Sequence, residues 1–284
     1  MSTVLTPPAP RLPTGTTPAP VLLATSHGTS DPAGQRAVVA LVAAVAVAAP
    51  ELSVVGGYVD VQSPDVPTCL AEIAAAAGSG TGAGRAGFDQ PVVIVPLLLS
   101  AGYHVRVDLA EAAAAASQPV HVTGALGPDP RLARILAGRL AEIGLRPDDR
   151  VVLAAAGSTD AGAVEDCHST GAQLAAVLGR PVTVGFISAA QPRLADAVHT
   201  ARAGASGRVV VATYLLAPGY FAGLAENCGA DAVSRPLLVD GEAPPRELVD
   251  VVVDLYTSTA RLDAALTGLP WTTNPRRLTP APTA

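Results

Sequence analysis

The sequence contains no lysine, because all 18 of its basic residues are arginines. A Walker A phosphate loop needs a lysine to reach the nucleotide phosphates, and an enzyme that forms a Schiff base needs a lysine amine. The absence of lysine therefore excludes both of these classes.

Positive charge and long apolar segments are also scarce. The chain has 24 acidic and 18 basic residues, a net charge of −6 and no run of basic residues, which argues against nucleic acid or an anionic membrane as a partner. The longest apolar run, 38–49, is shorter than the roughly 20 residues that a transmembrane helix needs. Residues 1–20 lack the pattern of a signal peptide. We therefore expect a cytoplasmic protein that binds neither nucleic acid nor membrane.

Cysteine is rare too. Cys69, Cys167 and Cys228 lie far apart in the sequence and form no CxxC pair. This spacing predicts neither a disulfide framework nor a zinc site built from thiolates.

A chain of 284 residues is long enough for two domains. Short apolar runs alternate with helical stretches rich in alanine and leucine, a pattern typical of βαβ units on parallel sheets. The predicted strands are 19–25, 52–59, 91–99, 120–125, 151–156, 182–187, 208–215 and 234–239. The predicted helices are 32–48, 65–77, 105–116, 129–143, 161–178, 192–203, 219–228 and 245–266.

The ends of the chain are rich in proline and threonine, which predicts a disordered tail over 1–18 and a flexible tail over 269–284. Between them we expect one module over 19–146 and a second over 147–268. A glycine-rich run at 82–87 (GAGRAG) matches the dinucleotide fingerprint in letters only. It follows a predicted helix instead of a strand, so we interpret it as a loop.

The second module repeats the first but lacks its histidines. The run 21–31 (VLLATSHGTSD) returns as 151–160 (VVLAAAGSTD), which places His27 opposite Ala156. The run 92–104 (VVIVPLLLSAGYH) returns as 209–221 (VVVATYLLAPGYF), which places His104 opposite Phe221. We therefore expect the chemistry to lie in the first module.

His27 and His104 each follow the carboxyl end of a predicted strand, and ligand sites in parallel sheets gather at that edge. Neutral imidazole is a good ligand for divalent iron, cobalt, nickel or zinc. Asp60 follows the predicted strand 52–59, which lies between His27 and His104 in the sequence. The residue at the equivalent position of the second module, its repeat mate, is Ser188. A carboxylate at this position could bind the metal or accept a proton. It could equally be an ordinary turn residue.

Other candidates are weaker. His121 begins a strand at the opposite edge of the sheet, and His168 and His199 fall within predicted helices of the second module. Neighbouring residues on a helix do not share a face, so Cys167 and His168 form no metal pair. The chain lacks the GxSxG motif of serine hydrolases.

Three motifs together, 25–29 (TSHGT), 57–60 (GYVD) and 95–105 (VPLLLSAGYHV), resemble those of the CbiX/SirB-type class II chelatases. The resemblance covers both modules. It implies an α/β fold of two Rossmann-like domains, each with a four-stranded parallel sheet flanked by helices, and a cleft between them. The two metal-binding histidines of that family correspond to His27 and His104, and its acidic residue, usually glutamate, corresponds to Asp60.

The resemblance implies insertion of Fe²⁺ or Co²⁺ into sirohydrochlorin, without ATP, in siroheme or cobalamin biosynthesis. The metal would be a substrate, with no permanently bound cofactor. A flat, carboxylated tetrapyrrole needs apolar walls, backbone N–H donors and arginines. The candidate substrate-binding residues are Ser26, Gly28, Ser100, Gly102, Tyr103, Arg106 and Phe221, with Arg36, Tyr214 and Tyr220 as further candidates.

The sequence is also compatible with other functions. A duplicated scaffold with one altered half could be a carrier of metal or tetrapyrrole that has no catalytic activity. Imidazole and carboxylate ligands do not separate nickel from iron or cobalt, so a chelatase for nickel or for another tetrapyrrole is also compatible. The protein could be a monomer or a homodimer.

Overall fold

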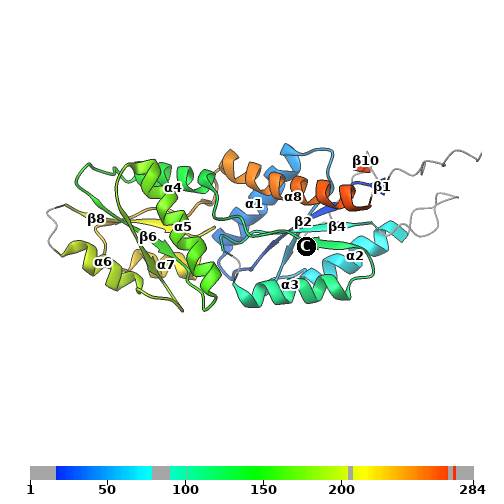
Figure 1. The fold of residues 1–284 in the computed structure, drawn as a ribbon, viewed down its shortest axis with the longest axis horizontal. Coiled ribbons are helices and arrows are strands. Elements are labelled where there is room, and N and C mark those ends of the chain that lie inside the picture. Colours follow the sequence, from blue (N-terminus) through cyan, green and yellow to red (C-terminus); the bar gives the residue numbers. More distant parts are fainter. Residues whose placement is uncertain (1–16, 79–89, 101, 204–206, 268–270, 273–284) are drawn as a thin grey trace, which may run out of the picture.

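Two four-stranded parallel sheets lie side by side along the long axis of the molecule (Figure 1). The computed structural model describes residues 17–78, 90–100, 102–203, 207–267 and 271–272. The first sheet has the order β3-β2-β4-β5 and the second has the order β7-β6-β8-β9. Their strands are β2 (Val21–Ser26), β3 (Val54–Tyr58), β4 (Val92–Pro96), β5 (Val120–Val122), β6 (Arg150–Ala155), β7 (Val182–Phe186), β8 (Val209–Tyr214) and β9 (Ala232–Val233).

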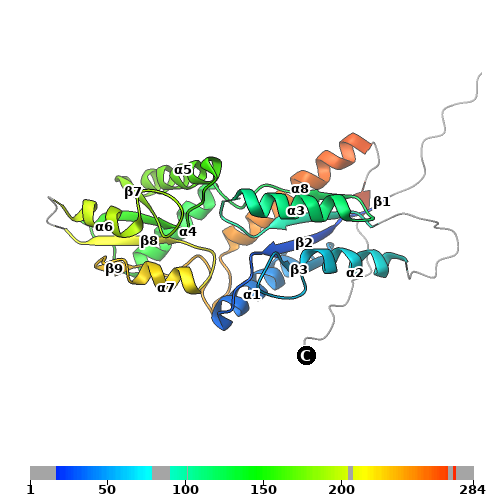
Figure 2. The ribbon, with the colours of Figure 1, turned by 90° about the horizontal axis from the view of Figure 1, so that it is seen from below.

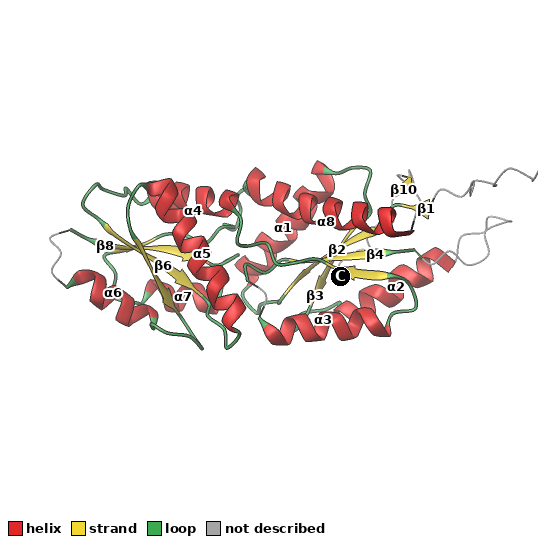
Figure 3. Cartoon of the chain, viewed as in Figure 1, coloured by secondary structure: helices red, strands yellow, loops and turns green. Residues whose placement is uncertain are grey.

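Helices flank both faces of each sheet, which confirms the predicted α/β class (Figure 3). They are α1 (Pro32–Ala48), α2 (Val66–Gly78), α3 (Tyr103–Ala115), α4 (Pro130–Glu142), α5 (Ala161–Leu178), α6 (Leu194–Arg202), α7 (Tyr220–Glu226) and α8 (Arg246–Thr267). The bounds of α1 and α5 match the prediction. Each begins after a capping aspartate, Asp31 or Asp160, whose carboxylate accepts two backbone N–H groups of the first turn.

The two modules exchange their last helices. Helix α4 follows the first sheet in the sequence but packs against α5 and β8 of the second module. Helix α8 ends the second module but packs against α1 and β4 of the first. Figures 1 and 2 show α4 over the second sheet and α8 over the first. The repeat in the sequence does not reveal this exchange.

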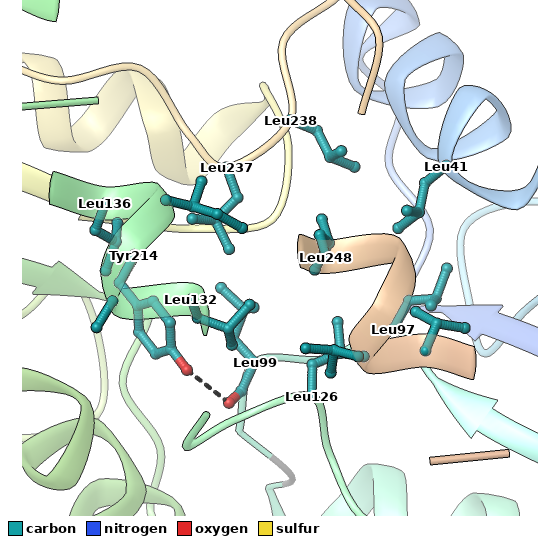
Figure 4. Packing of buried hydrophobic residues seen from close by; sticks show 14 of the residues in the cluster. Leu41, Leu97, Leu99, Leu126, Leu132, Leu136, Tyr214, Leu237, Leu238 and Leu248 are labelled. Atoms are coloured by element: carbon teal, nitrogen blue, oxygen red, sulfur yellow. Dashed lines mark hydrogen bonds between the residues drawn. The ribbon is translucent and has the colours of Figure 1, made fainter. Parts of the chain in front are cut away.

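The exchange joins the modules through one continuous core. A single cluster of buried side chains runs from β2, β4 and α1 through α8 and α4 to β6, β8 and α5. Leucines of both modules meet in it, among them Leu41, Leu99, Leu132, Leu237 and Leu248 (Figure 4). The outer face of each sheet has a smaller core of its own, under α2 and α3 in the first module and under α6 and α7 in the second.

The predicted strand at 234–239 is wrong. Strand β9 ends at Val233, and the following apolar run bends into the core between the modules. Pro236 has no N–H to donate to a ladder. Leu237 and Leu238 instead donate their N–H groups to the carbonyls of Leu215 and Leu216, just past the end of β8. The run is apolar because both leucines are buried at this junction.

The predicted tails need a correction at four residues. Strand β1 (Thr17–Pro18) pairs in parallel with β10 (Trp271–Thr272). The two segments meet because α8 returns to the start of the first sheet, where Tyr256 Oη donates to Pro20 O at 2.7 Å. The glycine-rich run at 82–87 lies outside the described residues. Within the described part of the chain, no helix is long and apolar enough to cross a membrane.

We expect Leu248→Ala to lower the free energy of unfolding by about 3 kcal/mol, the usual cost of truncating a fully buried leucine. Leu248 is fully buried in the core between the modules, whereas Leu262 of the same helix is 66% exposed. Leu262→Ala is the matched control and should cost less than about 0.5 kcal/mol. Denaturant unfolding measures both, and equal losses would contradict the packing of α8 on the first module.

Candidate active site

The residues singled out in the first module follow three neighbouring strands. Because β2 pairs with both β3 and β4, the turns after these strands lie at the same edge of the sheet. Asp60 N donates to His27 O at 3.0 Å, and Val59 N donates to Ser26 O at 2.9 Å. The side chains of His27 and Asp60 are both exposed. The structure thus brings His27 and Asp60 onto adjoining turns, with their side chains accessible to a ligand.

A glycine allows these two turns to approach each other. Gly28 has a φ of +95°, and a Cβ there would lie 2.1 Å from Asp60 O. Its repeat mate Gly157 has a φ of +91°, with Ser188 O at 2.0 Å from a Cβ. Any other residue would be strained and would clash with backbone. Both modules therefore keep the same backbone at this turn, although only the first has a histidine beside it.

Two glutamines hold the His27 turn, and sequence reasoning missed both. Gln62 Oε1 accepts from Thr29 N at 2.9 Å, and Gln35 Nε2 donates to Thr29 O at 2.8 Å. Their repeat mates are Ala190 and Val164, which cannot make these bonds. A comparison of the two modules could have identified both glutamines, because these polar side chains occur only in the module that contains His27.

His104 lies in the first turn of α3, after the capping residue Gly102. The side chains of Tyr103, His104 and Arg106 lie outside the described residues, so their predicted roles stay predictions. The backbone places His104 on the helix that follows β4, and β4 pairs with β2, the strand that His27 follows. Among the described side chains, no three His, Cys, Asp or Glu residues are grouped so that they could hold a metal ion.

The second module faces this edge of the first sheet. A Cβ on Gly102 would lie 3.3 Å from Ser158 Oγ, and a Cβ on Gly219 would lie 3.3 Å from Thr29 Oγ1. Gly219 is the repeat mate of Gly102, and Ser158 is the repeat mate of Thr29. The two modules therefore meet reciprocally, with the first turn of each against the third turn of the other.

Helix α7 starts at this junction and carries an exposed apolar cluster, Tyr220, Phe221 and Leu224. The rings of Tyr220 and Phe221 meet edge to face at 5.8 Å, a favourable aromatic geometry. Because Gly219 adjoins Thr29, the start of α7 lies close to the turn that carries His27.

Two further substrate candidates are engaged in contacts between the modules. Tyr214 is 2% exposed and donates from Oη to Leu99 O at 3.0 Å, so it cannot form a wall for a ligand. Arg36 forms an ion pair with Asp240 across the modules, which engages its guanidinium. An apolar or basic residue near a strand end can contact either the other module or a ligand. Its neighbours in the sequence do not show which of the two it contacts.

Ser26 and Ser100 also line this edge. Ser26 is buried, and its hydroxyl has no hydrogen-bond partner among the described residues. Ser100 is half-buried, and its hydroxyl accepts from Cys167 Sγ at 3.9 Å. Burial raises the pKa of the Cys167 thiol and raises that of Cys69 to about 11. Both thiols therefore keep their protons at pH 7 in this structure.

The fold and the paired modules are those of the chelatases. SirB from Bacillus subtilis with Fe³⁺ superimposes with a TM-score of 0.69 at 18% identity, over 89% of this chain and 100% of that one. A sirohydrochlorin chelatase SirB from Bacillus subtilis subspecies spizizenii in complex with cobalt gives a TM-score of 0.61 at 14% identity, over 87% and 97%. A multi-domain protein from Deinococcus radiodurans with structural similarity to chelatases gives 0.56 at 19%, over 84% and 55%.

Sequence comparison identifies the family. The CbiX family model matches residues 21–143 and 150–223, and so it spans both modules. No curated protein sequence matches the chain. The chain belongs to the CbiX family, as the histidine motifs predict.

We expect Gly28→Ala to weaken Co²⁺ binding, because the new Cβ would push the His27 turn away from the Asp60 turn. Gly157→Ala is the matched control, since it introduces the same strain in the module that lacks the histidines. Each variant should lose at least about 2 kcal/mol of stability. Only Gly28→Ala should raise the dissociation constant for Co²⁺, measured by titration calorimetry. Equal Co²⁺ affinities of the two variants would contradict the assignment of the metal site to the first module.

Proposed function

We propose that this protein inserts a divalent metal ion, Fe²⁺ or Co²⁺, into sirohydrochlorin without ATP. Membership of the CbiX family supports this function. The similar structures of SirB, one with Fe³⁺ and one with cobalt, support a metal ion as the substrate. We further propose a cytoplasmic location and a role in siroheme or cobalamin biosynthesis.

One observation carries the proposal. The two modules share their backbone at the turn after the first strand, including Gly28 and Gly157 with nearly equal positive φ. His27, Asp60 and His104 nevertheless have Ala156, Ser188 and Phe221 as their repeat mates. The scaffold alone does not require the three groups, because the second module folds without them. Their presence on adjoining turns of one module is therefore best explained by a ligand.

In the proposed reaction, His27 and His104 bind the incoming ion as neutral imidazoles. Neutral ligands leave the charge of the ion uncompensated, so it stays attractive to the ring nitrogens of the macrocycle. Insertion of one divalent ion releases two pyrrole protons, which leaves the charge balanced. Asp60, whose carboxylate is exposed, and the imidazoles freed of the metal are the bases that accept these protons.

The second module would contribute the apolar surface for the macrocycle. Tyr220, Phe221 and Leu224 of α7 are exposed, and α7 begins directly after Gly219, which adjoins Thr29 of the His27 turn. A flat aromatic ligand stacks well on such side chains. The backbone N–H groups near Gly28, Ser100 and Gly102, and the guanidinium of Arg106, would bind its carboxylates.

The function is tested by following the absorbance of sirohydrochlorin with Co²⁺ or Fe²⁺ under anaerobic conditions. The wild type should turn over many times, and His27→Ala and His104→Ala should each slow the reaction by at least about 100-fold. His199→Ala is the control, because His199 is an exposed histidine on α6 of the second module.

Several outcomes would contradict the proposal. Binding without repeated turnover would indicate a carrier of metal or tetrapyrrole. Turnover with Ni²⁺ alone, or only with another tetrapyrrole, would indicate a chelatase of different specificity. Histidine variants that are as fast as the wild type would remove the metal site from the first module. Sedimentation during the same work distinguishes a monomer from a homodimer.

A further inference from the structure

The segment between β4 and α3 leads to His104 in the first turn of α3, and the first half of this segment is bonded to its own module. Leu97 N donates to Thr25 O at 2.7 Å, and Leu98 O accepts from Leu126 N at 2.8 Å. The repeat mate of the second bond is present in the second module, where Leu215 O accepts from Leu237 N at 3.0 Å. Up to Leu98, the segment is held in the same way in both modules.

The next residues are held by the second module. Tyr214 Oη, at the end of β8, donates to Leu99 O at 3.0 Å (Figure 4). Cys167 Sγ of α5 lies 3.9 Å from Ser100 Oγ, and Gly102 adjoins Ser158. Three contacts from the opposite module thus precede the helical turn of His104.

The bond from Tyr214 has no counterpart in the repeat. In the second module, Leu216 O, the repeat mate of Leu99 O, accepts a backbone N–H from Leu238 at 2.8 Å. The repeat mate of Tyr214 is Leu97, a buried residue without a polar side chain. Only the module with the histidines receives a side-chain donor at this position, and it receives that donor from its partner module.

The residues around the Tyr214 hydroxyl leave room for its hydrogen bond to Leu99 O. A Cβ on Gly127 would lie 2.1 Å from Tyr214 Oη and 2.6 Å from Leu99 O, so this position must be glycine for the bond to form. Thr170 Oγ1 donates to Tyr214 Oη at 3.3 Å. Burial raises the pKa of Tyr214, so the phenol keeps its proton and remains a donor across the working range of the protein.

We propose that Tyr214 of the second module is a positioning residue that orients the His104 segment of the first module for metal binding. The proposal rests on the proposed function, because it assigns His104 to the metal. Tyr214 touches neither substrate nor metal. It acts through the carbonyl of Leu99, which lies five residues before His104 in the sequence. The second module would then help to form the metal site even though it has no histidine there.

The chain offers a matched control for the test. Tyr256 is also a buried tyrosine, 3% exposed, and its Oη also donates to a backbone carbonyl, that of Pro20. Its bond ties α8 to the start of the first sheet, at the amino-terminal end of β2 and so at the edge away from His27. Tyr214→Phe and Tyr256→Phe each remove one buried phenol hydroxyl and differ in the segment that loses its donor.

We expect both variants to show a similar drop in Tm, and only Tyr214→Phe to bind Co²⁺ about 10-fold more weakly than the wild type. In the insertion assay, Tyr214→Phe should raise KM for Co²⁺ by a similar factor with a smaller change in kcat. A purely structural role would lower the amount of folded enzyme and leave KM unchanged. Gly127→Ala, which places a methyl group against the Tyr214 hydroxyl, should reproduce the increase in KM.

Wild-type Co²⁺ affinity and KM in both Tyr214→Phe and Gly127→Ala would overturn the proposal. Equal weakening of Co²⁺ binding by Tyr214→Phe and Tyr256→Phe would also overturn it, because the effect would then be a general loss of packing. His104→Ala distinguishes a failure of the positioning role from a failure of the proposed function. If His104→Ala loses Co²⁺ and Tyr214→Phe does not, the positioning role fails and the proposed function stands. If His104→Ala binds Co²⁺ like the wild type, the metal assignment itself fails.

Discussion

The exchange of α4 and α8 between the modules is the constraint on which the rest of the structure depends. Each sheet needs helices on both faces, because its strands are apolar on both sides. Each module completes its inner face with a helix that belongs to the other in the sequence, so the two inner cores become one. Neither module can then move far from the other without exposing apolar surface. The carboxyl edges of the two sheets are held opposite each other as a result.

The two modules share a backbone but differ in the side chains at their facing edges. Both modules retain the glycine turn at Gly28 and Gly157, where the space for a Cβ is taken by a backbone carbonyl. The first module adds glutamines that hold the His27 turn, and it receives the Tyr214 hydroxyl from its partner. The second module places apolar and aromatic residues on α7. The backbone is symmetric, whereas the polar groups that can serve a metal gather on one side.

Local patterns in the sequence predict the fold well. The stretches rich in alanine and leucine predict the bounds of α1 and α5, and buried strands are visible as short apolar runs. The apolar run at 234–239 is misleading because its leucines are buried between the modules and not within a sheet. The helix exchange is not predictable from the repeat, since equivalent residues keep the same pattern whichever sheet they cover.

The site is predictable only in part. The contrast between His27 and Ala156, and between Asp60 and Ser188, predicts that the first module carries the proposed metal site, because the same backbone turn forms in both modules without requiring these side chains. The same contrast, applied to Gln62 and Ala190, would have found the residues that hold the turn. Tyr214 and Arg36 could not be assigned from sequence. Each lies near a strand end as a ligand residue would, and only the three-dimensional structure shows the contact that it makes with the other module.

We propose that one chain has one metal site, on the first module, despite its two similar modules. Anomalous diffraction from a crystal of the full chain loaded with Co²⁺ tests it directly. We expect one anomalous peak per chain, between His27 and His104. A second peak of similar height beside Ala156 and Phe221, or a single peak there, would contradict it.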